Sequence, residues 1–256
     1  AEYGLPHARS VAIESDREFG LSVLQALAAE VNRRGDLLRG TGGAHSSLQT
    51  LRTETGEKLP RILLVFDEFQ VLFAKTDKVG TAASDLLESL IRQGRGFGIH
   101  VLLASQSLSG LDALGSHVPQ LLPVRILMPA SENDAAKVLG EGNSGGKLLS
   151  KAGEGIFNGN GGAVEANQPF RGSLLNESDR VKHLATQREL ADESGFMRRP
   201  VVFEGNAPLS ADDVPAERFI EEVRGAKKRS LRLRFGAPMA ISGSSDIDLR
   251  REGGAN

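Results

Sequence analysis

The sequence predicts an α/β fold in which a parallel β-sheet is flanked by helices. Two continuous apolar runs, at residues 61–66 and 99–104, are typical of strands that are buried on both faces of such a sheet. A helix is predicted between them, over residues 79–93. Because neighbouring parallel strands are joined by a crossover helix, this strand–helix–strand order predicts that the two runs lie side by side.

The segments before this unit predict one more strand and one helix. Residues 11–13 are short and strand-like, and the capping box Ser15-x-x-Glu18 predicts the start of a helix that ends near Gly40. Residues 41–59 are polar and rich in glycine, and they predict a loop.

The segments after this unit predict two more strands and another helix. A third strand of the sheet is expected at residues 124–128, followed by a helix that Ser131 caps and that runs to Leu139. Residues 153–164 are glycine-rich and turn-like, with a short strand at 155–157.

The composition changes after Arg171. Two charged segments, 177–193 and 216–228, predict helices, and residues 199–203 between them predict a strand. Residues 230–235 alternate polar and apolar side chains, as an edge strand does.

The overall composition excludes several classes of protein. The 256 residues carry a net charge of −2, which gives no global signature of binding to nucleic acid or to an anionic membrane. The chain has no cysteine and only 5% aromatic residues, so disulfides, thiolate metal sites and stacking platforms for single-stranded nucleic acid are not expected. No apolar run approaches the ~20 residues of a membrane span. We expect a cytoplasmic domain, with any membrane attachment made by regions before Ala1.

The strongest motif is the apolar run 62–66 followed by Asp67 and Glu68, which is the Walker B pattern. A buried strand delivers both carboxylates to the carboxyl edge of the sheet, where α/β folds bind ligands. The first carboxylate is expected to hold the Mg²⁺ that bridges nucleotide phosphates, and the second to activate the attacking water as a general base. The structural alternative is a strand that ends in solvated acids.

The second buried strand ends in Ser105 and Gln106. A polar amide at this position can sense the γ-phosphate and help to orient the attacking water. The alternative is a polar turn at a strand end.

These motifs resemble the FtsK/SpoIIIE group of motor ATPases, which includes DNA translocases and the EccC ATPases of type VII secretion. Residues 64–69 and 94–106 carry most of the likeness, and it extends upstream to 5–7 and 30–34 and downstream to 124–126 and 153–158. It covers roughly residues 1–172. The resemblance implies a RecA-like P-loop NTPase core that is incomplete at the N-terminus.

The resemblance also implies an assembly and its nucleotide contacts. In this group the domains form hexameric rings or tandem arrays, and arginines of a neighbouring domain reach the nucleotide. Arg95 and Arg125 are the candidates here, and Arg33 or Arg34 is a weaker one. Each of them can instead be a solvated or ion-paired arginine. In the EccC-like pattern an arginine lies about where this chain has Ser22.

The loop that would cradle the ATP phosphates is not in this sequence, because no Gly-x-x-x-x-Gly-Lys-Ser/Thr motif occurs in it. Residues 141–148 imitate the motif but have Glu141 for the first glycine and Leu148 for the hydroxyl residue. Residues 140–145 imitate a dinucleotide fingerprint, but they follow a predicted helix and not a strand. We therefore expect that the isolated chain does not hydrolyse ATP.

The expected organisation has three parts: the Walker-B side of an ATPase domain at 1–172, a helical connector with one strand at 173–229, and a lead-in to a second ATPase domain at 230–256. Both ends read as cuts through a longer polypeptide. The resemblance implies a motor that binds and hydrolyses ATP with Mg²⁺, with DNA as its favoured cargo. A secretion ATPase that moves polypeptide is the first alternative. A degenerate ATPase-like module that only binds a partner is the second.

Overall fold

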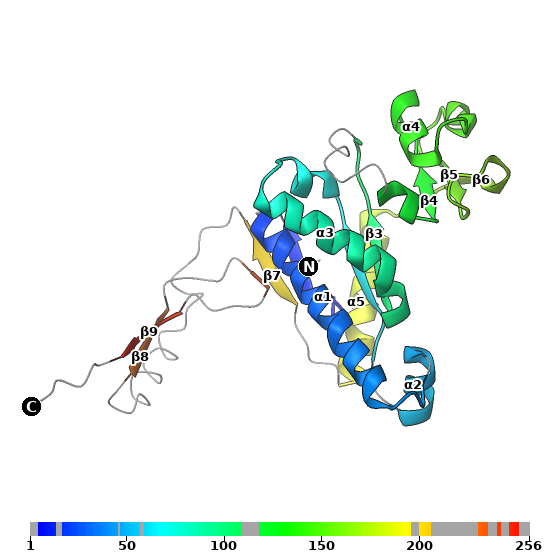
Figure 1. Ribbon diagram of the computed structural model, residues 1–256. Coiled ribbons are helices and arrows are strands. Elements are labelled where there is room, and N and C mark those ends of the chain that lie inside the picture. Colours follow the sequence, from blue (N-terminus) through cyan, green and yellow to red (C-terminus); the bar gives the residue numbers. More distant parts are fainter. Residues whose placement is uncertain are drawn as a thin grey trace, which may run out of the picture. The chain divides into compact units, whose positions relative to one another are not determined.

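The computed structural model describes residues 5–13, 17–45, 47–56, 59–108, 118–195, 200–205, 230–234, 240–241 and 246–250. The chain divides into two compact units, Leu24–Thr186 and the combination of Ala1–Val23 with Gln187–Asn256. Figure 1 labels most of their helices and strands.

A parallel strand pair forms the centre of the unit Leu24–Thr186. Strand β2 (Ile62–Phe66) pairs with β3 (Ile99–Leu103) along its whole length. Helix α3 (Lys78–Gln93) connects them, and its N-terminus is capped by Asp77, whose carboxylate accepts from the Gly80 N–H at 2.8 Å. The predicted strand–helix–strand unit is confirmed, and its register places the carboxyl ends of both strands at one edge.

The two strands are covered on one face. Helix α3 contacts β3 and buries Ala83, Leu87 and Leu90. On the opposite face Leu63, Val65 and Leu102 keep 59%, 60% and 46% of their surface exposed. The expectation of burial on both faces is therefore wrong for the described residues, because the continuous apolar run does not reveal which elements cover the second face.

The segment 124–128 forms a strand, but in a different sheet from the one predicted. Strand β4 (Arg125–Leu127) pairs antiparallel with β5 (Glu154–Asn158), which in turn pairs antiparallel with β6 (Asn167–Arg171). An apolar run of this length fits a parallel and an antiparallel partner equally well, and here the turn-rich segment after β5 supplies β6 as a further antiparallel neighbour.

This antiparallel sheet is closed by a helix and by a buried group of amides. Helix α4 (Glu132–Leu139) is capped by Ser131 as predicted, and it packs Ala135 and Leu139 against Leu127 and Ile156. Asn143, Asn158 and Asn167 bond to one another at 2.7–3.1 Å. Asn158 is fully buried, and its amide also binds the backbone of the 160–163 turn. These bonds hold the loop after α4 against β5 and β6.

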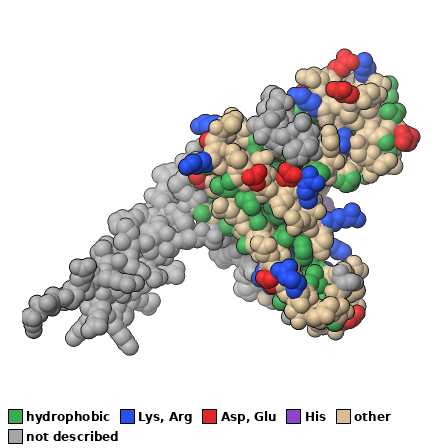
Figure 2. Space-filling view, viewed as in Figure 1, with side chains coloured by type: hydrophobic (Ala, Val, Ile, Leu, Met, Phe, Trp, Pro, Cys, Tyr) green, Lys and Arg blue, Asp and Glu red, His purple; other side chains and the backbone are tan. Residues whose placement is uncertain are grey.

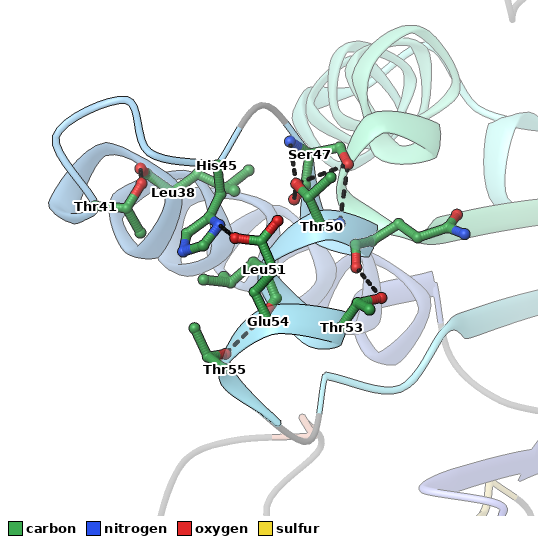
Figure 3. A network of polar contacts seen from close by, with 10 residues as sticks. Leu38, Thr41, His45, Ser47, Thr50, Leu51, Thr53, Glu54 and Thr55 are labelled. Atoms are coloured by element: carbon green, nitrogen blue, oxygen red, sulfur yellow. Dashed lines mark hydrogen bonds and ion pairs between the residues drawn. The ribbon is translucent and has the colours of Figure 1, made fainter.

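Residues 41–59 contain a helix, so the prediction of a loop there is wrong. Helix α2 (Leu48–Thr55) follows helix α1 (Arg17–Gly40) and starts at a capping box formed by Ser47 and Thr50. Figure 3 shows this box and the His45 ring, whose Nδ1 lies 3.1 Å from Glu54 Oε2. The sequence pattern was missed because threonine takes the place of the usual glutamate at the third helical position.

Helix α2 is held by apolar contacts. Leu48 and Leu51 are buried against Leu59, with Leu37, Leu38 and Phe97 packed around them. Beside this cluster the guanidinium of Arg34, which is 1% exposed, donates to the carbonyls of Pro60 and Phe97. These carbonyls lie two residues before the first residues of β2 and β3, so α1 is fixed close to the start of both strands.

In the unit Ala1–Val23 with Gln187–Asn256, strand β1 (Ser10–Ile13) pairs in parallel with β7 (Val201–Glu204). The rings of Phe19 and Phe203 stack with their centroids 4.5 Å apart. Strand β8 (Ser230–Arg234) pairs antiparallel with β9 (Asp246–Arg250). Helix α5 (Glu177–Glu193) ends in this unit.

The strands predicted near 11–13, 199–203 and 230–235 and the helix at 177–193 are confirmed. The capping residue Ser15 and the helix predicted at 216–228 lie outside the described residues.

The described residues also contain short 3-10 helices, which are η2 (Phe69–Phe73), η3 (Gly94–Phe97), η5 (Val118–Leu121), η6 (Ser144–Leu148) and η7 (Val164–Ala166). Every helix among the described residues is too short or too polar to cross a lipid bilayer.

Candidate functional site

The candidate site lies at the carboxyl edge of the β2–β3 pair. Asp67 and Glu68 follow β2, while Ser105 and Gln106 follow β3 within the β3 tip, which we define as residues 104–107. The backbone pairing continues into this edge, because Ala104 N–H donates to Phe66 O at 2.9 Å and Phe69 N–H to Ala104 O at 3.3 Å. The structure thus brings together the polar residues that the sequence predicted at the two strand ends.

Glu68 has a left-handed backbone conformation, with φ 47° and ψ 41°. It is the one residue other than glycine with a positive φ in the described part of the chain. The left-handed region costs a residue with a Cβ roughly 1–2 kcal/mol, so surrounding bonds must hold Glu68 in place. One of them joins its N–H to Asp67 Oδ1 at 3.1 Å.

The carboxylate of Glu68 is held by two donors. Its Oε1 accepts from the backbone N–H of Gln106 at 3.3 Å, and its Oε2 accepts from the Gln70 side-chain amide at 2.6 Å. The Gln106 side chain itself is exposed. The acid that follows β2 is therefore bonded directly to the β3 tip.

Gln70 belongs to the site, although no motif in the sequence points to it. Its Oε1 accepts from the Ser105 hydroxyl at 2.7 Å, and the Ser105 oxygen also contacts the backbone of Ser107. The available signal was the position of Gln70, two residues after Glu68. The short helix η2 that turns this amide back toward the strand edge is not evident from periodicity.

Asp67 is exposed beside Glu68, and its Oδ1 accepts the Glu68 N–H. Among the described residues, no three His, Cys, Asp or Glu side chains gather in a way that would hold a metal ion. Mg²⁺ keeps several waters and commonly binds one or two carboxylates together with substrate phosphates. A single exposed carboxylate at a strand edge therefore fits Mg²⁺ that arrives with a nucleotide.

The candidate arginines lie away from this edge. Arg95 is exposed in η3, which precedes β3 and thus lies at the opposite end of the strand from Gln106. Arg125 is half-buried in the antiparallel sheet, where its guanidinium donates to Leu122 O and Val138 O at 3.1 Å, and burial lowers its pKa. Neither is brought beside Asp67 and Glu68 within one chain.

The weaker candidates have local partners. Arg33 and Arg34 both bind Glu30, and Arg34 is buried. Ser22, where the EccC-like pattern has arginine, is also buried. Its hydroxyl donates to Phe19 O at 2.7 Å and accepts from Ile241 N–H at 3.0 Å. Position 22, which is an arginine in the EccC-like pattern, therefore lies in the interior of this chain.

The segment that imitates a phosphate loop has a different structure. It follows α4, a helix, and its Lys147 binds Glu132 at 2.6 Å. A phosphate loop requires a preceding strand and a following helix. The structure thus agrees with the sequence argument against a nucleotide loop at residues 140–148.

The structure places an Asp-Glu pair after one parallel strand and bonds it to the polar tip of the next, at the edge where α/β folds bind ligands. The comparisons with solved structures agree with the P-loop ATPase class that the resemblance implies. The chain is similar to ATPases 2 and 3 of EssC from Geobacillus thermodenitrificans (TM-score 0.59, 14% identity, 96% of this chain and 44% of that one). It is also similar to the pCW3 conjugation coupling protein TcpA with ATPgS (TM-score 0.55, 18% identity, 68% and 49%). The fold is that of the RecA-like P-loop ATPase domains.

No family model matches the chain. In sequence it is 28% identical over 247 residues to the DNA translocase SftA of Bacillus subtilis, covering 90% of this chain and 24% of that protein. It is 24% identical over 226 residues to the DNA translocase FtsK of Staphylococcus aureus (84% and 27%). It is 28% identical over 163 residues to the ESX-5 secretion system protein EccC5 of Mycobacterium tuberculosis (60% and 11%).

The chain is therefore a homologue of the SftA and FtsK DNA translocases and of the EccC ATPases, which supports the FtsK/SpoIIIE-type ATPase that its motifs predict. The chain spans only part of the length of these relatives: 24% of SftA, 27% of FtsK and 11% of EccC5.

Proposed function

We propose that this chain supplies the catalytic carboxylate side of an ATP-hydrolysing motor of the FtsK/SpoIIIE type. The observation that carries the proposal is the bond between the Glu68 carboxylate and the backbone N–H of Gln106, at 3.3 Å. It joins the acid after β2 to the β3 tip at the edge where α/β folds bind ligands.

In this proposal each residue has a distinct role. Glu68 accepts a proton from the attacking water as a general base, and the Gln106 side chain contacts the γ-phosphate and orients that water. Asp67 holds Mg²⁺ through water. When bound, Mg²⁺ neutralises charge on the phosphates. The phosphates themselves require backbone N–H groups and a lysine that residues outside this chain would supply.

Arg95 and Arg125 are proposed to contact a nucleotide of a neighbouring domain, either in a homo-oligomeric ring or in a tandem array. The position of Arg95 supports a role in trans. Since it lies at the amino end of β3, it cannot share an edge with Glu68 of the same chain. For Arg125 the same role would require its bonds to Leu122 O and Val138 O to be exchanged for phosphate.

DNA is the cargo we propose first. The match to the translocases SftA and FtsK covers 90% and 84% of this chain, against 60% for EccC5. The charge distribution adds no support, since Figure 2 shows basic and acidic side chains interspersed over the described residues of one face. A DNA track would therefore consist of local lysines and arginines.

A polypeptide cargo is the second candidate. The fold likeness to ATPases 2 and 3 of EssC covers 96% of this chain. A tandem organisation is what a secretion ATPase of the EccC type would have. This candidate keeps the same roles for Asp67, Glu68 and Gln106.

The proposed roles are tested in the complete gene product. Glu68→Gln preserves the shape of the side chain and removes the base, so ATP should still bind while turnover falls by about 10²-fold or more. Asp67→Asn should instead weaken the Mg²⁺-dependent step, so that half-maximal activity requires a higher Mg²⁺ concentration. Asp85→Asn, an exposed acid on α3, is the matched control and should behave as the parent. A Glu68→Gln protein that hydrolyses ATP at the parent rate contradicts the proposal.

A further inference from the structure

Gln70 is a half-buried side chain that is held at both ends of its amide. Its Nε2 donates to Glu68 Oε2 at 2.6 Å, and its Oε1 accepts from the Ser105 hydroxyl at 2.7 Å. It thus connects the acid that follows β2 with the residue that follows β3, through side chains alone.

The chemistry of the partners fixes the orientation of the amide. An ionised carboxylate only accepts hydrogen bonds, so the NH₂ group of Gln70 must face Glu68. The amide oxygen then faces Ser105, whose hydroxyl can donate. Donation therefore runs in one direction, from Ser105 to Gln70 to Glu68. A flipped amide would turn its oxygen toward the Glu68 carboxylate and lose that bond, although its NH₂ group could still donate to the Ser105 oxygen.

Glu68 needs such support because its own backbone is strained. Its φ of 47° is held at the end of a strand, and the other bond to its carboxylate, from Gln106 N–H, is longer at 3.3 Å against 2.6 Å for Gln70. Hydrogen bonds to a charged group are stronger than those between neutral groups. The Gln70 amide is accordingly the stronger restraint on where the Glu68 carboxylate points.

We propose that Gln70 is a positioning residue for Glu68, through which Ser105 in the β3 tip sets the orientation of the general base. The inference rests on the proposed role of Glu68 in ATP hydrolysis. It adds a regulatory connection, because any movement of the β3 tip would be passed to the Glu68 carboxylate through the Gln70 amide.

The first test is Gln70→Met in the complete gene product, since methionine keeps the length of the side chain and loses both hydrogen bonds. We expect kcat for ATP hydrolysis to fall about tenfold or more, with KM for ATP unchanged, because misplacing a catalytic group costs chemistry and not binding. Gln93→Met, on the exposed end of α3, is the matched control and should keep the parent kcat.

The second test uses the hydroxyl at the other end of the amide. Ser105→Ala should lower kcat about threefold or more by releasing Gln70, and Ser105→Thr, which keeps a hydroxyl, should restore the parent value. Equal rates for Ser105→Ala, Ser105→Thr and the parent overturn the proposal. This pair also keeps it testable if Gln70→Met does not fold.

A double-mutant cycle separates positioning from a general structural role. In single-turnover measurements on Glu68→Gln, adding Gln70→Met should cause no further loss, because Gln70 acts only through the Glu68 carboxylate. Additive losses overturn the positioning role. An inactive Glu68→Gln together with a fully active Gln70→Met overturns this inference alone, whereas a fully active Glu68→Gln overturns the proposed function.

Discussion

Arg34 Nε donates to Glu30 Oε1 at 2.7 Å from a guanidinium that is 1% exposed. The other oxygen of Glu30 accepts from Arg33 Nε at the same distance, but Arg33 is 53% exposed. The two arginines lower the pKa of Glu30 to about 2. The hydrogen bond from Arg33 is the largest cause of this shift. One carboxylate thus has a buried partner and a solvated partner of the same chemical type.

The two arginines should differ strongly in their effect on stability. Arg34→Met should lower the free energy of unfolding by about 3 kcal/mol, because it removes the buried partner of Glu30 and the hydrogen bonds to the carbonyls of Pro60 and Phe97. Arg33→Met should cost less than about 1 kcal/mol, since an exposed ion pair contributes little. Urea denaturation of both variants measures the difference. If both variants lost the same free energy of unfolding, the contacts of Arg34 would not be what holds α1 to the rest of the fold.

Glu30 should also make stability depend on acid. Its pKa is 4.5 in an unfolded chain and about 2 in the fold. The group therefore stabilises the fold fully above pH 4.5, and this contribution is lost as the pH falls toward 2. The loss should be about 1–2 kcal/mol, after allowance for solvent around Arg33.

The test of this acid effect compares the parent with Glu30→Gln, whose amide cannot titrate. The parent's free energy of unfolding should fall more steeply between pH 4.5 and pH 3, as measured by urea denaturation at a series of pH values. Parallel curves for the two proteins would mean that the Glu30 carboxylate is not stabilised by the arginines.

The site could be predicted from the sequence to the extent that it depends on strand ends. Two apolar runs around a helix predicted that Asp67, Glu68 and Gln106 would meet at one edge, and they do. Gln70 could not be predicted, because it reaches Glu68 through a 3-10 turn that has no apolar periodicity of its own.

The parts of the fold that were missed depend on hydrogen bonds made by polar side chains. Hydrogen bonds between the side-chain amides of Asn143, Asn158 and Asn167 help to hold the β4–β5–β6 sheet. Asparagines in a glycine-rich sequence look like ordinary loop residues. Helix α2 was missed because its cap uses Thr50. Sequence periodicity reports the apolar contacts of an element, and these elements depend equally on polar ones.

The 256 residues alone should bind ATP weakly and should not hydrolyse it. Their sequence has no phosphate loop, and the lysine of the imitating segment, Lys147, is paired with Glu132. Calorimetry with ATP and Mg²⁺ measures the affinity. Binding in the micromolar range would show that a phosphate site exists elsewhere in this chain.

The cargo can be tested through ionic strength. If the complete gene product moves along DNA, duplex DNA should raise its ATPase rate, and this stimulation should fall steeply with salt because phosphate contacts release counterions. The measurement is the ATPase rate with and without duplex DNA across a salt series, and an unrelated polyanion is the control. A rate that ignores DNA at low salt would favour the secretion motor or a partner-binding module.

The parallel pairing of Ser10–Ile13 with Val201–Glu204 has a consequence for synthesis on the ribosome. Chains emerge from the N-terminus at about 5–20 residues per second, so β1 waits roughly ten seconds or more for its partner strand. The pairs β2–β3 and β4–β5 close over much shorter stretches and are complete first. During that interval the ring of Phe19 has no Phe203 to stack on. Strand β1 is therefore open to wrong strand partners while residues 24–186 are being made.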